Sequence, residues 1–443
     1  MTVTPYDLPH VTYTDTLAHI TIPEGETQIH RSVLPGGIRV ITQQVPATRS
    51  VAIGMWFAVG SRDEHSGHYG STHYLEHLLF KGTKRFSAID IARSFDEVGG
   101  DTNATTAKEY THYYAHVLGE NVPMAIDVLM DMVTAPRLSA EDFDTERTVI
   151  LEELAMSADD PSDVAHESWA GQVFYNQDLG RPVGGTKATV LATPREAVIE
   201  HYRKTYSSQT LVVSASGAVD HEQVCELVLE HARDNGWDTT SESAPQPVRQ
   251  GKELDLTEAM NRRIERDWSQ AHILVGSRSF SATDERRPAM SLLLTILGGG
   301  MSSRLFQEVR EKRGLAYTTY AFDSAYSDSG AFAMYAGCTP DNAAEVERVM
   351  LGELEGIASG NISEDEVARA CGQLRGGIAL DMEVNGARMS RLGRSEIVRG
   401  EIYTIDQVLQ RLREVRPEDI SSVAQLLMER PRVRTYVGPA VTQ

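Results

Sequence analysis

Cysteine is scarce in this sequence. Only three occur among 443 residues, Cys225, Cys338 and Cys371, and no two form a CxxC pair. This number and spacing argue against a disulfide framework and against a cysteine-based zinc site. The cysteine usage fits a reducing compartment, and we therefore expect a cytoplasmic protein.

Long apolar runs and a targeting segment are also lacking. The longest apolar stretches, such as residues 291–297, are far too short to span a bilayer. The first ten residues contain neither the basic region nor the apolar region of a signal peptide. We expect no membrane partner.

Positive charge is in deficit. The chain has 42 Lys and Arg against 63 Asp and Glu, a formal net charge of −21. Such a surface repels phosphate backbones, so nucleic acid is excluded as an expected partner, whereas basic peptides would be attracted. The hydrophobic content of 41% is high enough for a sizeable folded core.

The chain divides at a segment poor in apolar residues. Residues 236–250 are rich in Ser, Thr and Pro and are typical of a linker. On both sides a strand pattern is followed by a loop and a helix, and each half ends with a Pro-initiated helix and a strand. We therefore predict a duplicated α+β unit. The predicted boundaries are a first domain over 1–235, a linker over 236–262 and a second domain over 263–443.

Hydrophobic periodicity and turn residues predict the elements of the first half. They are a hairpin over 30–45 with its turn at residues 35–37, a strand over 50–59, helices from 71 and over 87–98, the second with Ser87 as its N-cap, a hairpin over 102–118, helices over 123–133 and 139–156, a strand over 211–218 and a helix over 221–235.

Two histidines and a glutamate lie together on the helix predicted from residue 71. His73 and His77 are four residues apart and share one helix face, where two imidazoles can bind one tetrahedral zinc. Glu76 can take a proton from a water on that zinc without being a ligand. This is the H-x-x-E-H order, the inverted form of H-E-x-x-H. A bare histidine pair can be accidental among 14 histidines, and the glutamate between them strengthens the metal interpretation.

A catalytic zinc needs a third protein ligand. No third histidine stands at a helical spacing from the pair, so a distant carboxylate must serve. Glu146 and Glu153 are seven residues apart and share a helix face, whereas Glu152 points elsewhere. Spacing leaves two assignments open, with either Glu153 or Glu146 as ligand and the other nearby. Taken alone, these acids would be an ordinary solvated helix face.

Together these motifs resemble those of the pitrilysin-type, or M16, metallopeptidases, which include insulin-degrading enzyme and the mitochondrial processing peptidases. The resemblance is close over residues 73–83 and extends from about 31 to 438. It implies that Glu153 is the third ligand of one Zn²⁺ per chain, with Glu146 supporting the ligands from behind. It also implies two homologous α+β domains, each with a mostly antiparallel sheet and helices on one face. The first would bind zinc, and the second, whose helix at 290–297 lacks His and Glu, would complete the active site.

Two further segments match this family. Asn103 and Ala104 resemble residues of the strand beside the zinc, whose edge pairs with an extended substrate. Arg310 and Tyr317 match an Arg and a Tyr that reach the active site, where they would stabilise the oxyanion. The alternatives are a polar turn into a strand in the first case, and a helix-end charge followed by a strand aromatic in the second.

The expected function is zinc-dependent endoproteolysis of peptides or unfolded protein segments, with Glu76 as general base. Family members of this length usually dimerise, so we expect a homodimer. Two alternatives stay open. The chain could be a non-catalytic accessory subunit, although such subunits usually have eroded zinc motifs. It could also be a processing enzyme for basic leader sequences, with which the net charge of −21 is compatible.

Overall fold

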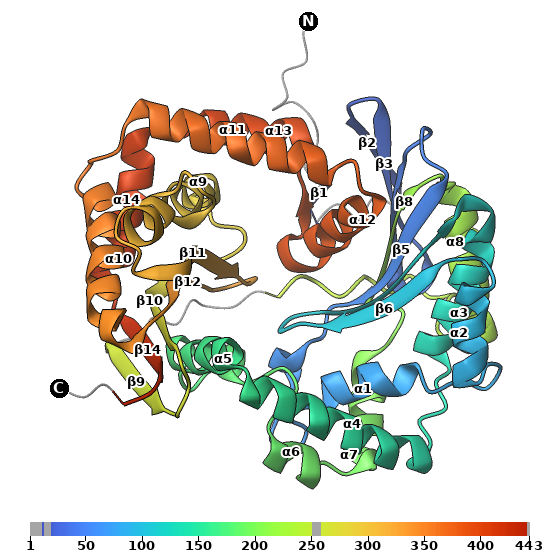
Figure 1. The fold of residues 1–443 in the computed structure, drawn as a ribbon. Helices are drawn as coiled ribbons and strands as arrows, with labels where there is room; N and C mark the ends of the chain where they lie inside the picture. Colours follow the sequence, from blue (N-terminus) through green and yellow to red (C-terminus); the bar gives the residue numbers. More distant parts are fainter. Residues whose placement is uncertain (1–10, 13–18, 250–257, 441–443) are drawn as a thin grey trace, which may run out of the picture. The chain divides into compact units, whose positions relative to one another are not determined.

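The computed structural model describes residues 11–12, 19–249 and 258–440 (Figure 1). The chain forms two compact units, and neither is continuous in sequence. The first contains Met1–Leu154, Arg181–Val248 and Leu380–Gln407, and the second contains Ala155–Gly180, Arg249–Ala379 and Val408–Gln443. The units therefore differ from the two halves of the sequence by one exchanged segment each.

The first unit is built on a seven-stranded sheet with the order β2-β3-β4-β8-β5-β7-β6. Neighbouring strands are antiparallel except for the parallel pair of β4 and β8. A two-stranded ribbon of β1 and β13 accompanies it. The strands are β1 (Val11–Thr12), β2 (His19–Glu24), β3 (Thr27–Val33), β4 (Arg39–Gln44), β5 (Ser50–Phe57), β6 (Asp101–Thr106), β7 (Thr111–Leu118), β8 (Leu211–Gly217) and β13 (Glu401–Ile402).

The hairpin of β3 and β4 shows how local sequence sets this sheet. The two strands are joined by a tight turn at Pro35–Gly37, as the sequence predicts. Gly36 has φ +84°, and a Cβ there would lie 1.9 Å from the carbonyl oxygen of Asp238. Only glycine fits this position, because it tolerates both the positive φ and the close backbone.

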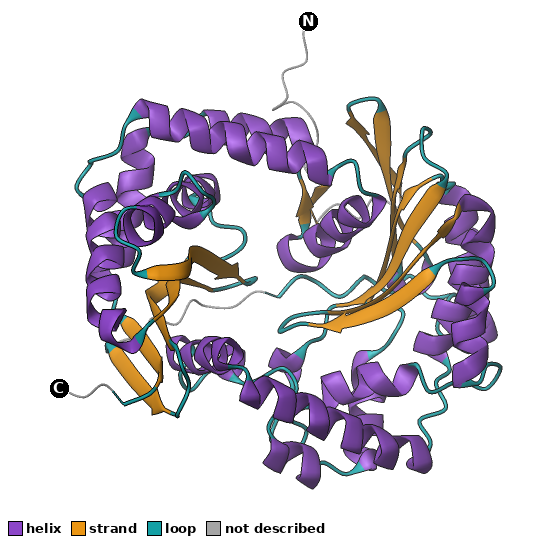
Figure 2. Cartoon of the chain, in the orientation of Figure 1, coloured by secondary structure: helices purple, strands orange, loops and turns teal. Residues whose placement is uncertain are grey.

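Helices cover one face of the first sheet (Figure 2). Ile53 and Met55 of β5 point into a core formed with α1, α3 and α8. Ser87 caps α2 by accepting from the backbone N–H of Asp90, as predicted. The helices are α1 (Ser71–Leu79), α2 (Ala88–Asp96), α3 (Val122–Thr134), α4 (Ala140–Asp159), which continues into the second unit, α6 (Lys187–Ala192), α7 (Arg195–Thr205) and α8 (His221–Asp234).

The second unit repeats this arrangement with a five-stranded sheet of order β11-β12-β10-β14-β9. Only β14 and β9 are parallel, so the pairing matches that of β6, β7, β5, β8 and β4 in the first sheet. Its elements are β9 (Met260–Glu265), β10 (Ala271–Ser279), α9 (Arg287–Gly298), β11 (Ala316–Ala325), β12 (Gly330–Cys338), α10 (Ala343–Ala358), α11 (Glu364–Asp381), α13 (Ile405–Arg413), α14 (Pro417–Glu429) and β14 (Val433–Gly438). The predicted fold class, two related α+β units, is confirmed.

Each sheet also carries one exchanged helix on its other face. In the first unit α12 (Asn385–Arg394) packs on β5 and β8, with Gly393 directly against the ring of Trp56. In the second unit α5 (Pro161–Val173) packs on β10 and β14, where Trp169 joins a buried cluster with Leu274. Along β5 and β10, Trp56 and Leu274 alternate with the residues that face the main core of each unit. Both exchanged helices therefore lie on the sheet face that points away from that core.

Strand β6 lies at the edge of the first sheet. Within the described residues it pairs only with β7, and its outer edge is free. Helix α1 packs against it, which brings the predicted catalytic helix beside a free strand edge. No helix in the described part of the chain is long and apolar enough to cross a membrane.

Candidate metal centre

Helix α1 presents both predicted histidines on one face. Leu75, Leu78 and Leu79 are buried in the core and fix the rotation of the helix. His73 and His77 are then neighbours across one turn, with ring centroids 4.8 Å apart. The spacing of four residues therefore brings the two rings together, as the helix geometry predicts.

Glu153 of α4 completes a cluster with this pair. Its Oε2 lies 3.4 Å from Nε2 of His77 and 3.8 Å from Nε2 of His73. Among the described residues, these three form the only group of three or more His, Cys, Asp or Glu whose ligand atoms all lie within 4.8 Å of one another. The Glu153 side chain is 47% exposed, so the cluster is open to solvent on that side.

Glu146 lies behind the cluster. Its Oε2 is 2.9 Å from Nδ1 of His77, and its Oε1 is 2.6 Å from Nζ of Lys81. The carboxylate is buried, so the ring of His77 is held with Nε2 turned towards Glu153. In this arrangement Glu153, and not Glu146, faces both Nε2 atoms.

This set of side chains fits zinc. Two imidazoles and one carboxylate are a usual ligand set for catalytic zinc, which leaves a fourth position open. Burial, with a smaller contribution from His77, lowers the pKa of His73 to about 4. His73 is therefore neutral near pH 7 and has a lone pair to offer a metal. The assignment of His73, His77 and Glu153 as ligands remains a prediction.

Glu76 points towards Thr106 at the end of β6. The Thr106 hydroxyl donates a hydrogen bond to Oε2 of Glu76. Burial raises the pKa of Glu76, and the hydrogen bond from Thr106 acts in the opposite direction. Sequence reasoning missed Thr106. Strand alternation, which places 102, 104 and 106 on one face, is the signal that could have found it.

Asn103 and Ala104 lie on the same edge strand. Asn103 is exposed and stands opposite Tyr114, whereas Ala104 is partly buried opposite Tyr113. The side-chain Oδ1 of Asn103 accepts from the backbone N–H of Ala104 at 2.8 Å. Both residues are on the strand that α1 packs against, and their contact with substrate stays a prediction.

Arg310 and Tyr317 belong to the second unit. Arg310 lies in a π-helical turn, Phe306–Glu311, and its guanidinium is 4.2 Å from the centroid of the Tyr317 ring. Tyr317 on β11 is 74% exposed. The structure brings these two residues to one another, and their predicted role at the zinc stays a prediction.

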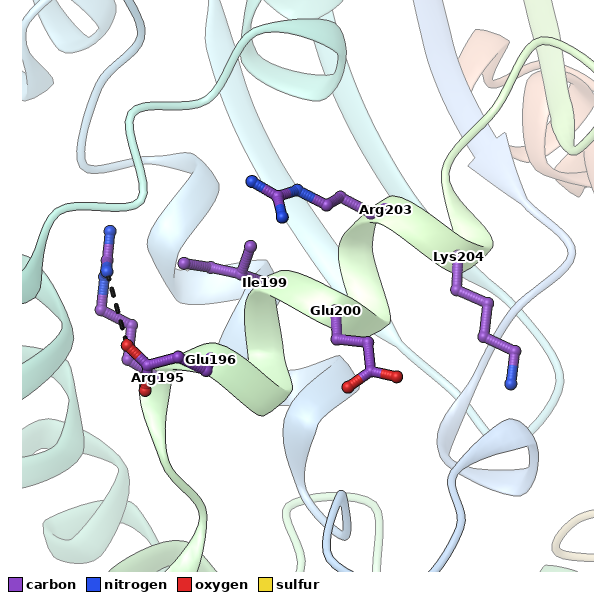
Figure 3. A pocket seen from close by; sticks show the side chains of 6 residues that line it. All are labelled: Arg195, Glu196, Ile199, Glu200, Arg203 and Lys204. Carbon is purple, nitrogen blue, oxygen red and sulfur yellow. Dashed lines mark ion pairs between the residues drawn. The ribbon is translucent and has the colours of Figure 1, made fainter.

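A shallow hollow of about 710 Å³ lies along α7 (Figure 3). Three basic and two acidic side chains of this one helix line the hollow, and Arg195 pairs with Glu196 at 3.9 Å. None of the predicted site residues lines it, so it is not the metal centre. The lining residues are Arg195, Glu196, Ile199, Glu200, Arg203 and Lys204.

The fold and the cluster together define a two-unit α+β protein with a candidate zinc centre, and comparison with known proteins gives its family. Residues 39–187 match the family model described as insulinase (peptidase family M16). Residues 193–374 match the model described as peptidase M16 inactive domain. The chain belongs to peptidase family M16.

Curated relatives extend over nearly the whole chain. An uncharacterized zinc protease of Streptomyces coelicolor is 45% identical, covering 93% of this chain and 90% of the relative. An uncharacterized zinc protease of Mycobacterium tuberculosis is 42% identical, covering 92% and 93%. One of Bacillus subtilis is 32% identical, covering 93% and 98%.

Solved structures share the fold at low sequence identity. A protease from Helicobacter pylori has a TM-score of 0.86 at 20% identity, covering 92% of this chain and 99% of that one. A peptidase M16 inactive domain from Pseudomonas fluorescens has a TM-score of 0.84 at 17% identity, covering 94% and 98%. At this identity the likeness establishes the fold alone.

Proposed function

We propose that this chain is a zinc-dependent endopeptidase that hydrolyses peptides or unfolded protein segments. The observation that carries the proposal is the convergence of His73, His77 and Glu153, with Glu76 on the same helix as the histidines. The relatives named zinc proteases support it, as does membership of family M16.

Each residue of the cluster has a role in this proposal. His73, His77 and Glu153 would hold one zinc per chain. Zinc, when bound, would polarise the scissile carbonyl and acidify a water. Glu76 would accept a proton at its carboxylate and pass it to the leaving amine. Because Thr106 donates to Oε2 of Glu76, the other carboxylate oxygen is left for that proton.

Substrate would bind as an added strand. The free edge of β6 offers backbone groups to an extended peptide, and Asn103 and Ala104 lie on that strand. An extended backbone is available in peptides and unfolded segments but not in most folded proteins, which sets the expected substrate class. Arg310 and Tyr317 would stabilise the oxyanion.

The test is cleavage of a mixed peptide pool by the purified chain alone. We expect products with zinc present, loss of cleavage with a chelator, and recovery when zinc is returned. Absence of cleavage by a chain shown to contain stoichiometric zinc would contradict the proposal.

A second candidate, an accessory subunit, is favoured by one observation. The second half matches a model described as an inactive domain, and a solved neighbour carries the same words in its title. That match begins at residue 193, whereas the cluster lies before it. Cleavage without any added partner would exclude the accessory role.

The remaining expectations belong to the same proposal. We propose a cytoplasmic homodimer that prefers basic substrates, as the net charge of −21 allows. Light scattering of the purified chain would measure the oligomeric state. Sequencing the cleavage products would test the preference, and no enrichment of Arg or Lys near the cut would contradict it.

A further inference from the structure

The first turn of α1 is held by a carboxylate from the preceding loop. Oε2 of Glu64 accepts from the backbone N–H of Gly70, and Oε1 accepts from that of Thr72, both at 2.8 Å. Gly70 is the N-cap of α1 and has no side chain to satisfy the free N–H groups of a helix start. Glu64, six residues upstream, therefore supplies the cap that the sequence lacks at Gly70.

The loop that carries Glu64 is itself fixed by Arg181. Nη2 of Arg181 lies within 3.2 Å of the backbone oxygens of Ser61, Arg62 and Glu64. Its guanidinium also lies 4.7 Å from the centroid of the Tyr69 ring. Arg181 thus fixes the backbone of the loop at Glu64. The Glu64 carboxylate in turn holds the start of α1 relative to that loop.

The two histidines of the cluster depend on the helix start to different degrees. His77 is held independently, because Glu146 lies 2.9 Å from its Nδ1. His73 directly follows Thr72, and its buried Nδ1 has no hydrogen-bond partner among the described residues. The position of its ring therefore relies on the backbone of the first turn.

We propose that Glu64 is a positioning residue for the metal centre: its two hydrogen bonds to the start of α1 hold His73 in line with His77 and Glu153. This inference rests on the proposed zinc site, which it extends to a residue outside the ligand set. Two N–H donors need two acceptor oxygens, so a carboxylate meets the requirement and an amide meets only half of it.

Burying the Glu64 carboxyl group has an unfavourable desolvation free energy. This argues that its contact with the start of α1 is not incidental. Glu64 is only 4% exposed, and burial raises its pKa to about 7 despite the two backbone hydrogen bonds. A buried carboxylate with no task is disfavoured relative to an apolar side chain. Its two bonds end at the turn that carries His73.

The experiment compares zinc affinity in three full-length variants. We expect Glu64→Ala to weaken zinc binding by about 10- to 100-fold in a chelator competition, as for other residues that orient metal ligands. Glu64→Gln, which keeps one acceptor, should fall between Glu64→Ala and the wild type. Glu109→Gln is the matched control, because Glu109 is 6% exposed and pairs with Arg62 of the same loop at 2.7 Å. It should bind zinc within about twofold of the wild type.

Hydrogen exchange of the metal-free proteins separates this inference from the proposed function. Amides at the start of α1 should exchange faster in the Glu64 variants than in the wild type and in Glu109→Gln. Wild-type affinity in Glu64→Ala, or equal weakening by Glu109→Gln, would overturn the inference. If Glu64→Ala does not fold, Glu64→Gln decides. A wild-type chain that binds no zinc would overturn the proposed function. Hydrogen exchange at the start of α1 would then decide whether Glu64 holds the start of that helix.

Discussion

In this structure Oε2 of Glu146 lies 2.9 Å from Nδ1 of His77. The contact assigns the two ring nitrogens different tasks, because an imidazole that donates from Nδ1 keeps the Nε2 lone pair free. Nε2 is the nitrogen that faces Glu153. One buried carboxylate thus sets both the tautomer and the orientation of a predicted ligand.

Removal of Glu146 should therefore weaken zinc binding without removing a ligand. We expect Glu146→Ala to lower zinc affinity by about 10- to 100-fold, since the His77 ring loses the partner that orients it. A chelator competition measures the effect. Glu141→Ala, an exposed carboxylate on the same helix, is the control. Wild-type affinity in Glu146→Ala would show that His77 is oriented by other contacts.

Loss of Glu153 should remove the metal. Glu153→Ala leaves only two imidazoles, and two ligands hold zinc far less firmly than three. Zinc content after dialysis should fall from about one per chain to near zero. Glu152→Ala is a close control, because both residues are exposed neighbours on α4 and only Glu153 joins the cluster. Equal zinc contents in the two variants would contradict the ligand assignment.

Glu76→Gln should separate metal binding from catalysis. The amide keeps the shape of the side chain but cannot take up a proton at neutral pH. We expect normal zinc content and a kcat/KM for peptide cleavage reduced by about 10²- to 10⁴-fold, the usual size of general-base catalysis. A variant with full activity would refute the assigned role.

Thr106→Val should shift the pH dependence of cleavage. Its hydroxyl donates to Glu76, so its loss removes an influence that lowers the pKa of that carboxyl. Because the ionised carboxylate is the active form, the acid limb of kcat/KM should move to higher pH. Thr105→Val is the control, since Thr105 is exposed on the other face of β6. A limb that stays in place would show that the hydrogen bond does not tune Glu76.

The exchanged helix of the first unit should be essential for its stability. Beyond the end of α12, Glu396 pairs with Arg31 of β3 at 2.9 Å, and both side chains are 2% exposed. Glu396→Ala leaves Arg31 buried without this partner and should lower the free energy of unfolding by about 3–5 kcal/mol. Urea denaturation measures this. Exposed Glu383→Ala should change it by less than about 0.5 kcal/mol. A small effect of Glu396→Ala would mean that the ion pair does not stabilise the docking of this segment.

The sequence predicted much of the local structure correctly. The hairpin turn at Pro35–Gly37, the Ser87 cap and the helix of His73 and His77 depend on residues close together in the chain. Turn residues and periodicity report such features directly. The duplication was also visible, and the matching strand pairing of the two sheets agrees with it.

The exchange of α5 and α12 between the two units was not predictable in this way. Both helices have the same kind of sequence pattern as the neighbouring helices, and their periodicity does not indicate which sheet they pack against. The choice is made by fit over long sequence separations, as where Gly393 meets Trp56. The cap that Glu64 provides depends in the same way on a loop held by Arg181.

For the site, the sequence by itself determined which side chains are candidates. The spacing of His73, Glu76 and His77 on one helix predicted two imidazole ligands and a general base, and the spacing of Glu146 and Glu153 limited the predicted third ligand to two residues. Tertiary structure decided their arrangement, because the packing of α4 against α1 is a long-range event that helical spacing cannot specify. This packing brought Glu153 close to Nε2 of both histidines and Glu146 close to Nδ1 of His77. The position of β6 brought the Thr106 hydroxyl within hydrogen-bonding distance of Glu76.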